Sequence, residues 1–320
     1  MTTLLITGGT GFFGKSLFSN FGENNLGIEK IVSLSRHPEK LNDVFEKKFP
    51  PFEIEYVAQD IREPIQLNES VDYIIHAAAE SSTTISVDNP MLMRDVVIEG
   101  TKNVLEFARL KKIKRVLLIS SGAVYGKQPS DLNHIPEDYE GAPDPLNPFN
   151  AYGCAKRQAE NLCALYYHHY GIDYVVARCF TFGGQYLPLD AHFAISNFIR
   201  DGLNGGPIMV KGDGTTVRSY LYADDLAEWL WTILKKGRTG ETYNVGSDKA
   251  ITIGDLAHIV SSCFEPNTEV IIKTKQSGKV NRYVPNVEKV KTILGVSEKI
   301  ALIDGIKRTI NYYQKKIYNL

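Results

Sequence analysis

The chain has 320 residues, of which 43% are hydrophobic and 23% are charged, and its formal net charge is -1 at pH 7. These values are typical of a globular protein with a sizeable core, and they exclude the basic excess of nucleic-acid-binding and membrane-surface proteins. The sequence after Met1 lacks an export signal, and no apolar run approaches the ~20 residues of a membrane span. We therefore expect a cytoplasmic protein without nucleic-acid or membrane partners.

The first half of the chain alternates short β-rich runs with amphipathic helical patterns. Helices are expected at 93–110 and 155–170, and strands at 4–7, 30–34, 53–58, 73–77, 115–120 and 174–179. Such alternation predicts an α/β fold with a doubly wound parallel sheet, helices on both faces and ligands at the carboxyl ends of the strands.

The first strand runs directly into a glycine-rich turn, in the stretch LLITGGTGFFG at residues 4–14. The spacing fits GxxGxxG and, starting one residue later, GxGxxG. Glycines permit a tight turn and let backbone amides approach a pyrophosphate at the start of the next helix. A purely steric glycine turn is the alternative, but the position after the first strand favours a Rossmann-type dinucleotide site. Its expected members are Gly8, Gly11, Phe12, Phe13 and Gly14.

The ends of the second and third strands indicate which dinucleotide binds. An NAD site places a carboxylate after the second strand for the ribose 2′-hydroxyl, whereas this chain has Ser35 and Arg36. A hydroxyl and a guanidinium suit a 2′-phosphate, so we expect NADP(H), with NAD as the alternative. A solvated Arg36 on an exposed turn is the other interpretation. Asp60, followed by Ile61, is expected to contact the adenine, unless Asp60 only caps the next turn.

Later in the chain, a set of three residues has the chemistry of an acid/base site. Ser121 ends the fifth strand in SSGAVYG at 120–126, and YGCAK at 152–156 contains Tyr152 and Lys156. At spacing i and i+4 on a helix, the phenol and the ammonium share one face. A free phenol has a pKa of ~10, and a nearby cation favours its phenolate form.

Taken together, these motifs resemble the extended short-chain dehydrogenase/reductase family of NAD(P)-dependent nucleotide-sugar epimerases, dehydratases and reductases. The resemblance covers nearly the whole chain in the family's order. It comprises the glycine turn, Asp60-Ile61, HAAA at 76–79, SSGAVYG, Tyr-x-x-x-Lys, RCF at 178–180 and GDGTTVRSYLYADDLA from Gly212.

The resemblance implies a role for each matched position. Tyr152 is the acid/base, Lys156 binds the nicotinamide ribose and lowers the pKa of the tyrosine, and Ser121 hydrogen-bonds the reacting sugar oxygen. The alanines of HAAA join the cofactor site: Ala77, Ala78 and Ala79. Arg218 binds the diphosphate of a nucleoside-diphosphate sugar and Arg282 is a second phosphate clamp. Substrate contacts or core positions are expected at Phe180, Thr181, His192, Asn197 and Phe198.

The composition and the pattern of expected elements change after residue 179. Glycine and proline become frequent, and short helices at 223–235 and 253–263 alternate with loops, which predicts a smaller mixed C-terminal lobe. We expect 1–178, with part of 215–250, to bind the dinucleotide and the remainder of 179–320 to bind the nucleotide sugar. The resemblance implies a homodimer formed through the helices at 93–110 and around Tyr152. Histidine and cysteine spacings indicate no metal site or disulfide framework.

Departures from the family's motifs bear on the reaction. The 4,6-dehydratases carry an Asp-Glu pair directly after the Ser/Thr, where this chain has Gly122 and Ala123, and Val97 and Thr181 replace family asparagines. We expect NADPH-dependent reduction of a nucleoside-diphosphate 4-keto(-6-deoxy) sugar, in which hydride reaches C4 and Tyr152 gives the proton. A nucleotide-sugar 4-epimerase with tightly bound NAD is the alternative. A 4,6-dehydratase comes next, and a non-catalytic nucleotide sensor last.

Overall fold

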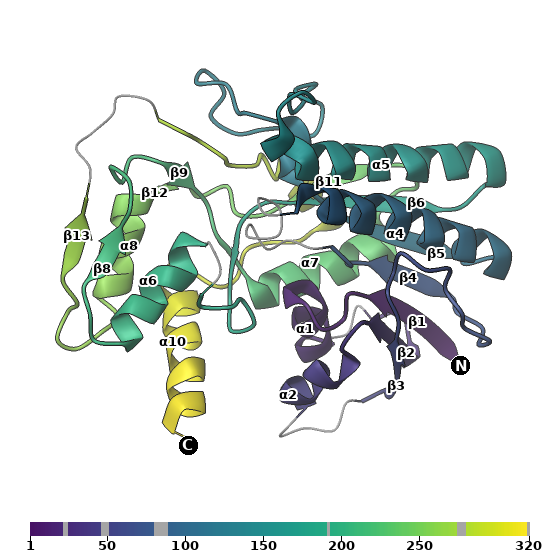
Figure 1. Cartoon of the computed structure of the whole chain (residues 1–320), viewed down its shortest axis with the longest axis horizontal. Helices are drawn as coiled ribbons and strands as arrows, with labels where there is room; N and C mark the ends of the chain where they lie inside the picture. The colour runs from purple at the N-terminus through teal and green to yellow at the C-terminus, as the bar shows by residue number, and fades with distance from the viewer. Residues whose placement is uncertain (22–24, 46–50, 80–88, 191–192, 274–279, 319–320) are drawn as a thin grey trace.

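A seven-stranded sheet forms the centre of the protein (Figure 1). The computed structural model describes residues 1–21, 25–45, 51–79, 89–190, 193–273 and 280–318. Within them the strand order is β11-β6-β5-β4-β1-β2-β3, and each neighbouring pair is parallel. The strands are β1 (Thr2–Thr7), β2 (Ile28–Ser35), β3 (Glu53–Ala58), β4 (Tyr73–His76), β5 (Arg115–Ser121), β6 (Tyr174–Cys179) and β11 (Thr242–Val245).

The six strands expected from the sequence are confirmed, each to within two residues at its ends. Strand β11 was not predicted, because its sequence TYNV is too short to establish a periodic pattern.

Helices cover both faces of the sheet, as the alternating pattern predicts. Along β1, Leu4 and Ile6 face one core and Leu5 faces the other, because successive side chains of a strand point to opposite faces. The first core includes side chains of α1 and α7, and the second those of α4 and α5. These helices are α1 (Phe12–Ser19), α7 (Ala223–Lys236), α4 (Pro90–Lys111) and α5 (Ala151–Tyr170), with the short α2 (Asn42–Phe45), η1 (Pro38–Leu41), η2 (Gly122–Tyr125) and η3 (Pro148–Asn150) between them.

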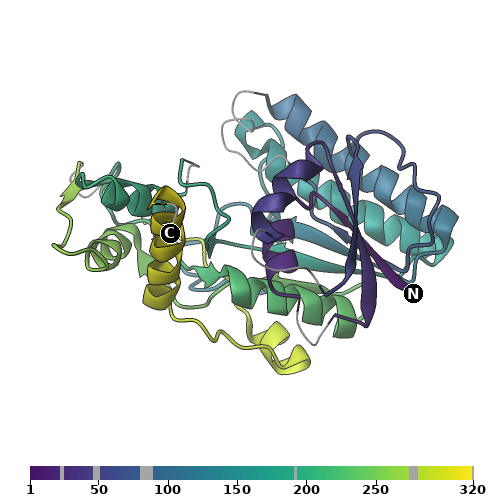
Figure 2. The ribbon, with the colours of Figure 1, turned by 90° about the horizontal axis from the view of Figure 1, so that it is seen from below.

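A smaller C-terminal lobe lies beside the sheet, at the left of Figure 2. Its own core contains Phe198, Ile208 and Leu256. The lobe contains α6 (Ala194–Leu203), β8 (Ile208–Val210), α8 (Ile253–Ser261), β13 (Val270–Ile272) and α10 (Leu302–Tyr318). The other late elements are β7 (Phe182–Gly183), which pairs with β10 (Leu221–Tyr222), β9 (Val217–Arg218), which pairs with β12 (Ile251–Thr252), and α9 (Glu288–Leu294), which packs beside β11.

The order of the strands fixes where a ligand can bind. Strand β1 lies between β4 and β2, so the chain reverses its direction across the sheet at the β1–β4 boundary. Ligands of such sheets bind in the crevice at the carboxyl ends of these strands. The fold class expected from the sequence is confirmed, while the domain boundary near residue 178 stays a prediction. No helix among the described residues is both long enough and apolar enough to cross a membrane.

Candidate active site

The glycine turn has the backbone geometry that its spacing predicts. Gly8 has a φ of +74°, and a Cβ added there would lie 2.7 Å from the nitrogen and the Cα of Ala78. Gly11 is the N-cap of α1 and provides no side chain to satisfy the first N–H groups of the helix. Backbone amides without side-chain caps at a helix start suit a pyrophosphate, so this turn fits a dinucleotide. The rings of Phe12 and Phe13, at the start of α1, pack against Phe182.

A buried hydrogen-bond chain explains the histidine of the HAAA motif. The Thr101 hydroxyl donates to the Val97 carbonyl (2.6 Å), so its oxygen accepts from Nε2–H of His76 (3.1 Å). Nδ1 of His76 is then free to accept from the Thr7 hydroxyl (2.7 Å), whose oxygen accepts from the Ala78 amide. Complete burial lowers the pKa of His76 to about 3, so the ring is neutral. This chain holds residues 77–79 against the glycine turn.

At the far end of the expected cofactor site, the structure ends β2 at Ser35. The Ser35 hydroxyl is buried and has no hydrogen-bond partner among the described residues. Arg36 follows it and is exposed. Asp60 accepts from the Arg62 amide (2.9 Å) and guanidinium (2.7 Å), which holds the pKa of this carboxyl below its usual range. Asp60 therefore caps its turn, and Ile61 is buried against the α4 helix at Gly100.

The three residues expected to be catalytic lie together. Tyr152 is in the first turn of α5, and its hydroxyl lies near Ser121 at the end of β5. Lys156 lies one turn later, with Nζ 5.8 Å from the centre of the Tyr152 ring. The Lys156 ammonium is buried and donates to the Ile119 carbonyl (2.7 Å). The Ser121 oxygen also accepts from the Ala123 amide (3.1 Å).

Burial dominates the acidity of this pair. It raises the pKa of Tyr152 to about 12, against a smaller lowering by the neighbouring Ser121 hydroxyl. The Lys156 ammonium is directed at the Ile119 carbonyl, and burial lowers the pKa of Lys156 itself to about 8. At neutral pH the phenol is therefore protonated and can act as an acid. The expected effect of Lys156 on the pKa of the tyrosine stays a prediction.

A partly buried ion pair holds the catalytic helix against the sheet. Glu160, one turn after Lys156, accepts from the guanidinium of Arg178 (2.7 Å) and from the hydroxyl of Ser120. Arg178 also donates to the hydroxyl of Tyr125 (2.9 Å). Sequence reasoning missed this contact, although spacing i, i+4, i+8 places Glu160 on the helix face of Tyr152 and Lys156.

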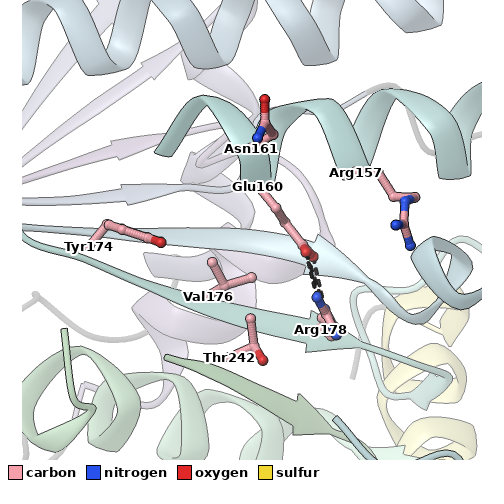
Figure 3. A pocket seen from close by; sticks show the side chains of 7 residues that line it. All are labelled: Arg157, Glu160, Asn161, Tyr174, Val176, Arg178 and Thr242. Atoms are coloured by element: carbon pink, nitrogen blue, oxygen red, sulfur yellow. Dashed lines mark hydrogen bonds and ion pairs between the residues drawn. The ribbon is translucent and has the colours of Figure 1, made fainter. Parts of the chain in front are cut away.

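A cavity of about 260 Å³ adjoins this ion pair and is separate from the predicted site residues. Figure 3 shows the ion pair between the helix and the strands. The residues that line the cavity are Arg157, Glu160, Asn161, Tyr174, Val176, Arg178 and Thr242. Among the described residues, no group of three His, Cys, Asp or Glu side chains could hold a metal ion.

The two arginines expected to bind phosphate come from adjacent segments. Arg218 is in β9 and donates to the side chain of Asn281 (3.2 Å), and burial lowers its pKa. Arg282 forms a bridge to Val217, directly beside Arg218 in the chain. The structure thus brings both guanidinium-bearing segments together.

The other expected substrate residues are more scattered. Phe180 and Thr181 follow β6, and Asn197 lies on α6, where its side chain accepts from Arg200 (3.3 Å). Phe198 is 3% exposed within the core of the lobe, which confirms the alternative of a core position. His192 lies outside the described residues.

One residue of the site was missed altogether. Tyr283 is partly buried, and its hydroxyl lies beside Ser121 and Gly122. Its ring stacks on Phe180 at 4.6 Å and 31°, and the guanidinium of Arg218 lies 5.8 Å from its centre. Gly122 leaves the room for it, because a Cβ there would lie 2.5 Å from the Tyr283 oxygen. Its neighbour Arg282 was the sequence signal that could have indicated this segment.

Comparisons with known proteins agree with this geometry. The model of the NAD dependent epimerase/dehydratase family matches residues 4–246. UDP-glucuronic acid decarboxylase 1 of Arabidopsis thaliana is 30% identical over 99% of this chain and 71% of its own. The structure of UDP-glucose 4-epimerase from Thermotoga maritima with UDP-glucose aligns at a TM-score of 0.85 and 25% identity, over 99% of this chain and 100% of that one.

A dTDP-glucose 4,6-dehydratase from Streptomyces venezuelae, solved with NAD, aligns at a TM-score of 0.83 and 25% identity, over 98% of this chain and 97% of that one. The glycine turn, the tyrosine–lysine pair and these matches lead to one conclusion: the chain belongs to the NAD-dependent epimerase/dehydratase family of enzymes.

Proposed function

We propose that this protein transfers a hydride from NADPH to C4 of a nucleoside-diphosphate 4-keto sugar, with Tyr152 as the proton donor. The juxtaposition of the Tyr152 and Ser121 hydroxyls, at the carboxyl edge of the sheet, is the observation that carries the proposal. This arrangement places two hydroxyl groups where one sugar oxygen can accept a hydrogen bond from each, on the edge of the sheet at which the dinucleotide turn also lies.

Each residue then has a distinct task. The amides after Gly11 hold the pyrophosphate, and Lys156 binds the ribose next to the nicotinamide. Ser121 holds the C4 oxygen and Tyr152 gives it a proton, for which the raised pKa keeps the phenol in its acid form. Arg218 holds the diphosphate of the substrate. When bound, the dinucleotide supplies the hydride.

The end of β2 supports NADPH as the cofactor. Ser35 offers an unpaired hydroxyl and Arg36 a guanidinium, a combination that suits a 2′-phosphate. A phosphorylated cofactor that exchanges as a co-substrate is typical of a reductase. Dehydration is disfavoured because Gly122 and Ala123 carry no carboxylate and the Tyr283 ring fills the space beside them.

A nucleotide-sugar 4-epimerase with bound NAD is the second candidate. It would use the same Ser121, Tyr152 and Lys156, and the similarity to the T. maritima UDP-glucose 4-epimerase favours it. For either reaction, we propose that residues 1–178, with part of 215–250, hold the dinucleotide and that the remainder of 179–320 holds the nucleotide sugar. We also propose a homodimer through α4 and α5, which expose Leu110, Leu165 and Tyr167; light scattering of the purified protein tests it.

The decisive experiment measures cofactor use by the purified protein. We expect oxidation of added NADPH in the presence of a nucleoside-diphosphate 4-keto-6-deoxy sugar, and a rate lower by about 10²-fold or more in Tyr152→Phe with NADPH binding retained. Tightly bound NAD and interconversion of C4 epimers without added cofactor would instead establish the second candidate. A wild-type rate in Tyr152→Phe, or no hydride exchange with any nucleotide sugar, would refute both.

A further inference from the structure

A chain of hydrogen bonds runs from the catalytic helix α5 to the segment 281–286. Arg178 donates to Glu160 of α5 (2.7 Å) and to the hydroxyl of Tyr125 (2.9 Å). The Tyr125 hydroxyl in turn meets Oδ1 of Asn244 on β11 (2.8 Å). Tyr125 is 1% exposed and Asn244 is 0% exposed, so water does not compete for the bond between them.

The direction of each bond in this chain follows from the chemistry of its groups. A guanidinium can only donate, so the Tyr125 oxygen accepts from Arg178 and the Tyr125 proton goes to Asn244. Burial raises the pKa of Tyr125 to about 12, so this proton stays in place at neutral pH. Nδ2 of Asn244 donates to the carbonyls of Ile135 (2.9 Å) and Asn286 (3.1 Å). A reversed amide would set its oxygen against two carbonyl oxygens, so the side chain has one favourable orientation.

Segment 281–286 is held at both ends by its backbone. Toward its start, the amide of Tyr283 donates to the Val217 carbonyl of β9 (3.1 Å). Toward its end, the amide of Asn286 donates to the Ile135 carbonyl (2.8 Å). The hydrogen-bond chain from α5 converges on this second contact, because the same two residues supply the carbonyls at its end. The chain therefore fixes the C-terminal end of the segment.

Between these two anchors lie the groups of the segment that border the site. The Tyr283 ring stacks on Phe180 at 4.6 Å, and a Cβ at Gly122 would lie 2.5 Å from the Tyr283 oxygen. Arg282, the expected second phosphate clamp, forms its bridge to Val217. A shift of the segment would move this phenol and this guanidinium-bearing residue together.

We propose that Tyr125 and Asn244 are positioning residues, which set the place of segment 281–286 relative to α5 and so the affinity for the nucleoside-diphosphate part of the substrate. The inference rests on the proposed function. Without the Tyr125 hydroxyl, the Asn244 amide loses the donor that orients it, and its hold on the segment weakens. The ion pair between Glu160 and Arg178 remains, so α5 keeps its place. The loss should therefore fall on substrate binding and spare the proton transfer.

The test is the variant Tyr125→Phe, which keeps the buried ring and removes only the hydroxyl. We expect KM for the nucleotide sugar to rise about fivefold, the factor that one neutral hydrogen bond is worth, while kcat changes by less than about twofold. The dissociation constant of UDP or dTDP, whichever binds more tightly, should rise by the same factor. That of NADPH should not change, because the glycine turn lies outside this hydrogen-bond chain.

Tyr243→Phe is the matched control. Tyr243 precedes Asn244 on β11 and is fully buried, but its side chain points to the opposite face of the sheet. Its hydroxyl accepts from the Arg238 amide (3.1 Å). Each variant removes one buried phenol hydroxyl and its hydrogen bond, so a merely structural role of Tyr125 predicts similar effects in both. The inference predicts that KM rises in Tyr125→Phe and stays at the wild-type value in Tyr243→Phe.

A second measurement does not depend on turnover. Amide hydrogen exchange, followed by mass spectrometry on the protein without substrate, reports how firmly segment 281–286 is held. We expect exchange there to be about fivefold faster in Tyr125→Phe and unchanged in Tyr243→Phe, because local opening becomes easier where an anchor is weakened. Exchange across α5 should match the wild type in both variants.

The outcomes separate this inference from the proposed function. If Tyr152→Phe is inactive but Tyr125→Phe matches the wild type in KM and in hydrogen exchange, the inference is wrong and the proposed function stands. A similar rise of KM in Tyr125→Phe and Tyr243→Phe, or a fall of kcat larger than the rise of KM, also overturns the inference. If no nucleotide sugar is turned over, the proposed function fails. The inference then stands if Tyr125→Phe weakens the binding of UDP or dTDP, and it falls otherwise.

Discussion

The contact between Gly8 and the end of β4 makes the sharpest prediction about the cofactor site. In Gly8→Ala, the new Cβ would lie 2.7 Å from the Ala78 backbone, whereas ordinary contacts begin at 3.4 Å. The turn or the end of β4 must therefore move by about 0.7 Å. Overpacking of this kind costs about 1–3 kcal/mol, and an L-residue at positive φ costs ~1–2 kcal/mol more. We expect a total of roughly 2–5 kcal/mol.

Two other glycines separate these contributions. Gly27 has a φ of +66° with nothing within 4 Å, so Gly27→Ala carries the backbone strain without the clash. Gly206 has open space and no positive φ, so Gly206→Ala should be nearly neutral. At about 2–4 °C per kcal/mol, Gly8→Ala should lower the melting temperature by roughly 4–20 °C and Gly27→Ala by roughly 2–8 °C.

Nucleotide binding gives the second readout of this series. The displaced turn should weaken NADPH or NADH binding by about tenfold or more in Gly8→Ala, measured by fluorescence titration, because the amides no longer meet the pyrophosphate. Gly27→Ala should bind as the wild type does. If Gly8→Ala has the same melting temperature as Gly27→Ala and binds nucleotide as the wild type does, the close approach of the turn to β4 is not the reason for glycine at position 8.

Three further predictions concern charged groups. Lys156→Met should be inactive yet about 1–3 kcal/mol more stable to unfolding at pH 7, because burial disfavours the ammonium. The gain should shrink between pH 8 and 10.5, where the folded lysine is neutral and the unfolded one is still charged. An equal stability of the variant and the wild type at pH 7 would contradict this reasoning. Arg36→Ala should weaken NADPH binding about tenfold more than NADH binding in a titration, and equal losses would exclude a 2′-phosphate role. Glu160→Gln leaves the partly buried Arg178 without its charge partner and should cost about 2–4 kcal/mol in urea unfolding, against under ~1 kcal/mol for Glu106→Gln, whose ion pair is more exposed. Similar costs for both variants would show that the Glu160–Arg178 pair does not hold α5.

Much of the fold followed from the sequence because its signals are local. Strand and helix periodicities predicted six of the seven strands in the sheet and the two long helices α4 and α5. The glycine spacing and the Tyr152–Lys156 spacing depend on one turn and one helix, so they too could be placed. Strand β11 offered only four residues and no such signal.

What the sequence could not provide depends on contacts distant along the chain. Tyr283 reaches Ser121 only because the segment beside β9 folds back to the end of β5. The pKa of Tyr152 depends on how deeply the folded chain buries it, and a motif that places a lysine four residues later says nothing of burial. The long-range contacts and the burial of these side chains could therefore be found only in the structure.

The neutral imidazole of His76 makes the nucleotide turn a weak point in acid. Its pKa falls from 6.5 to about 3 on folding, so the unfolded chain binds the extra proton first as the medium is acidified. Folding stability should therefore decline from about pH 6.5 downward, by up to roughly 4 kcal/mol at pH 3 from this one ring. A protonated ring can no longer accept from the Thr7 hydroxyl, so acid acts first on the strand ends that frame the dinucleotide.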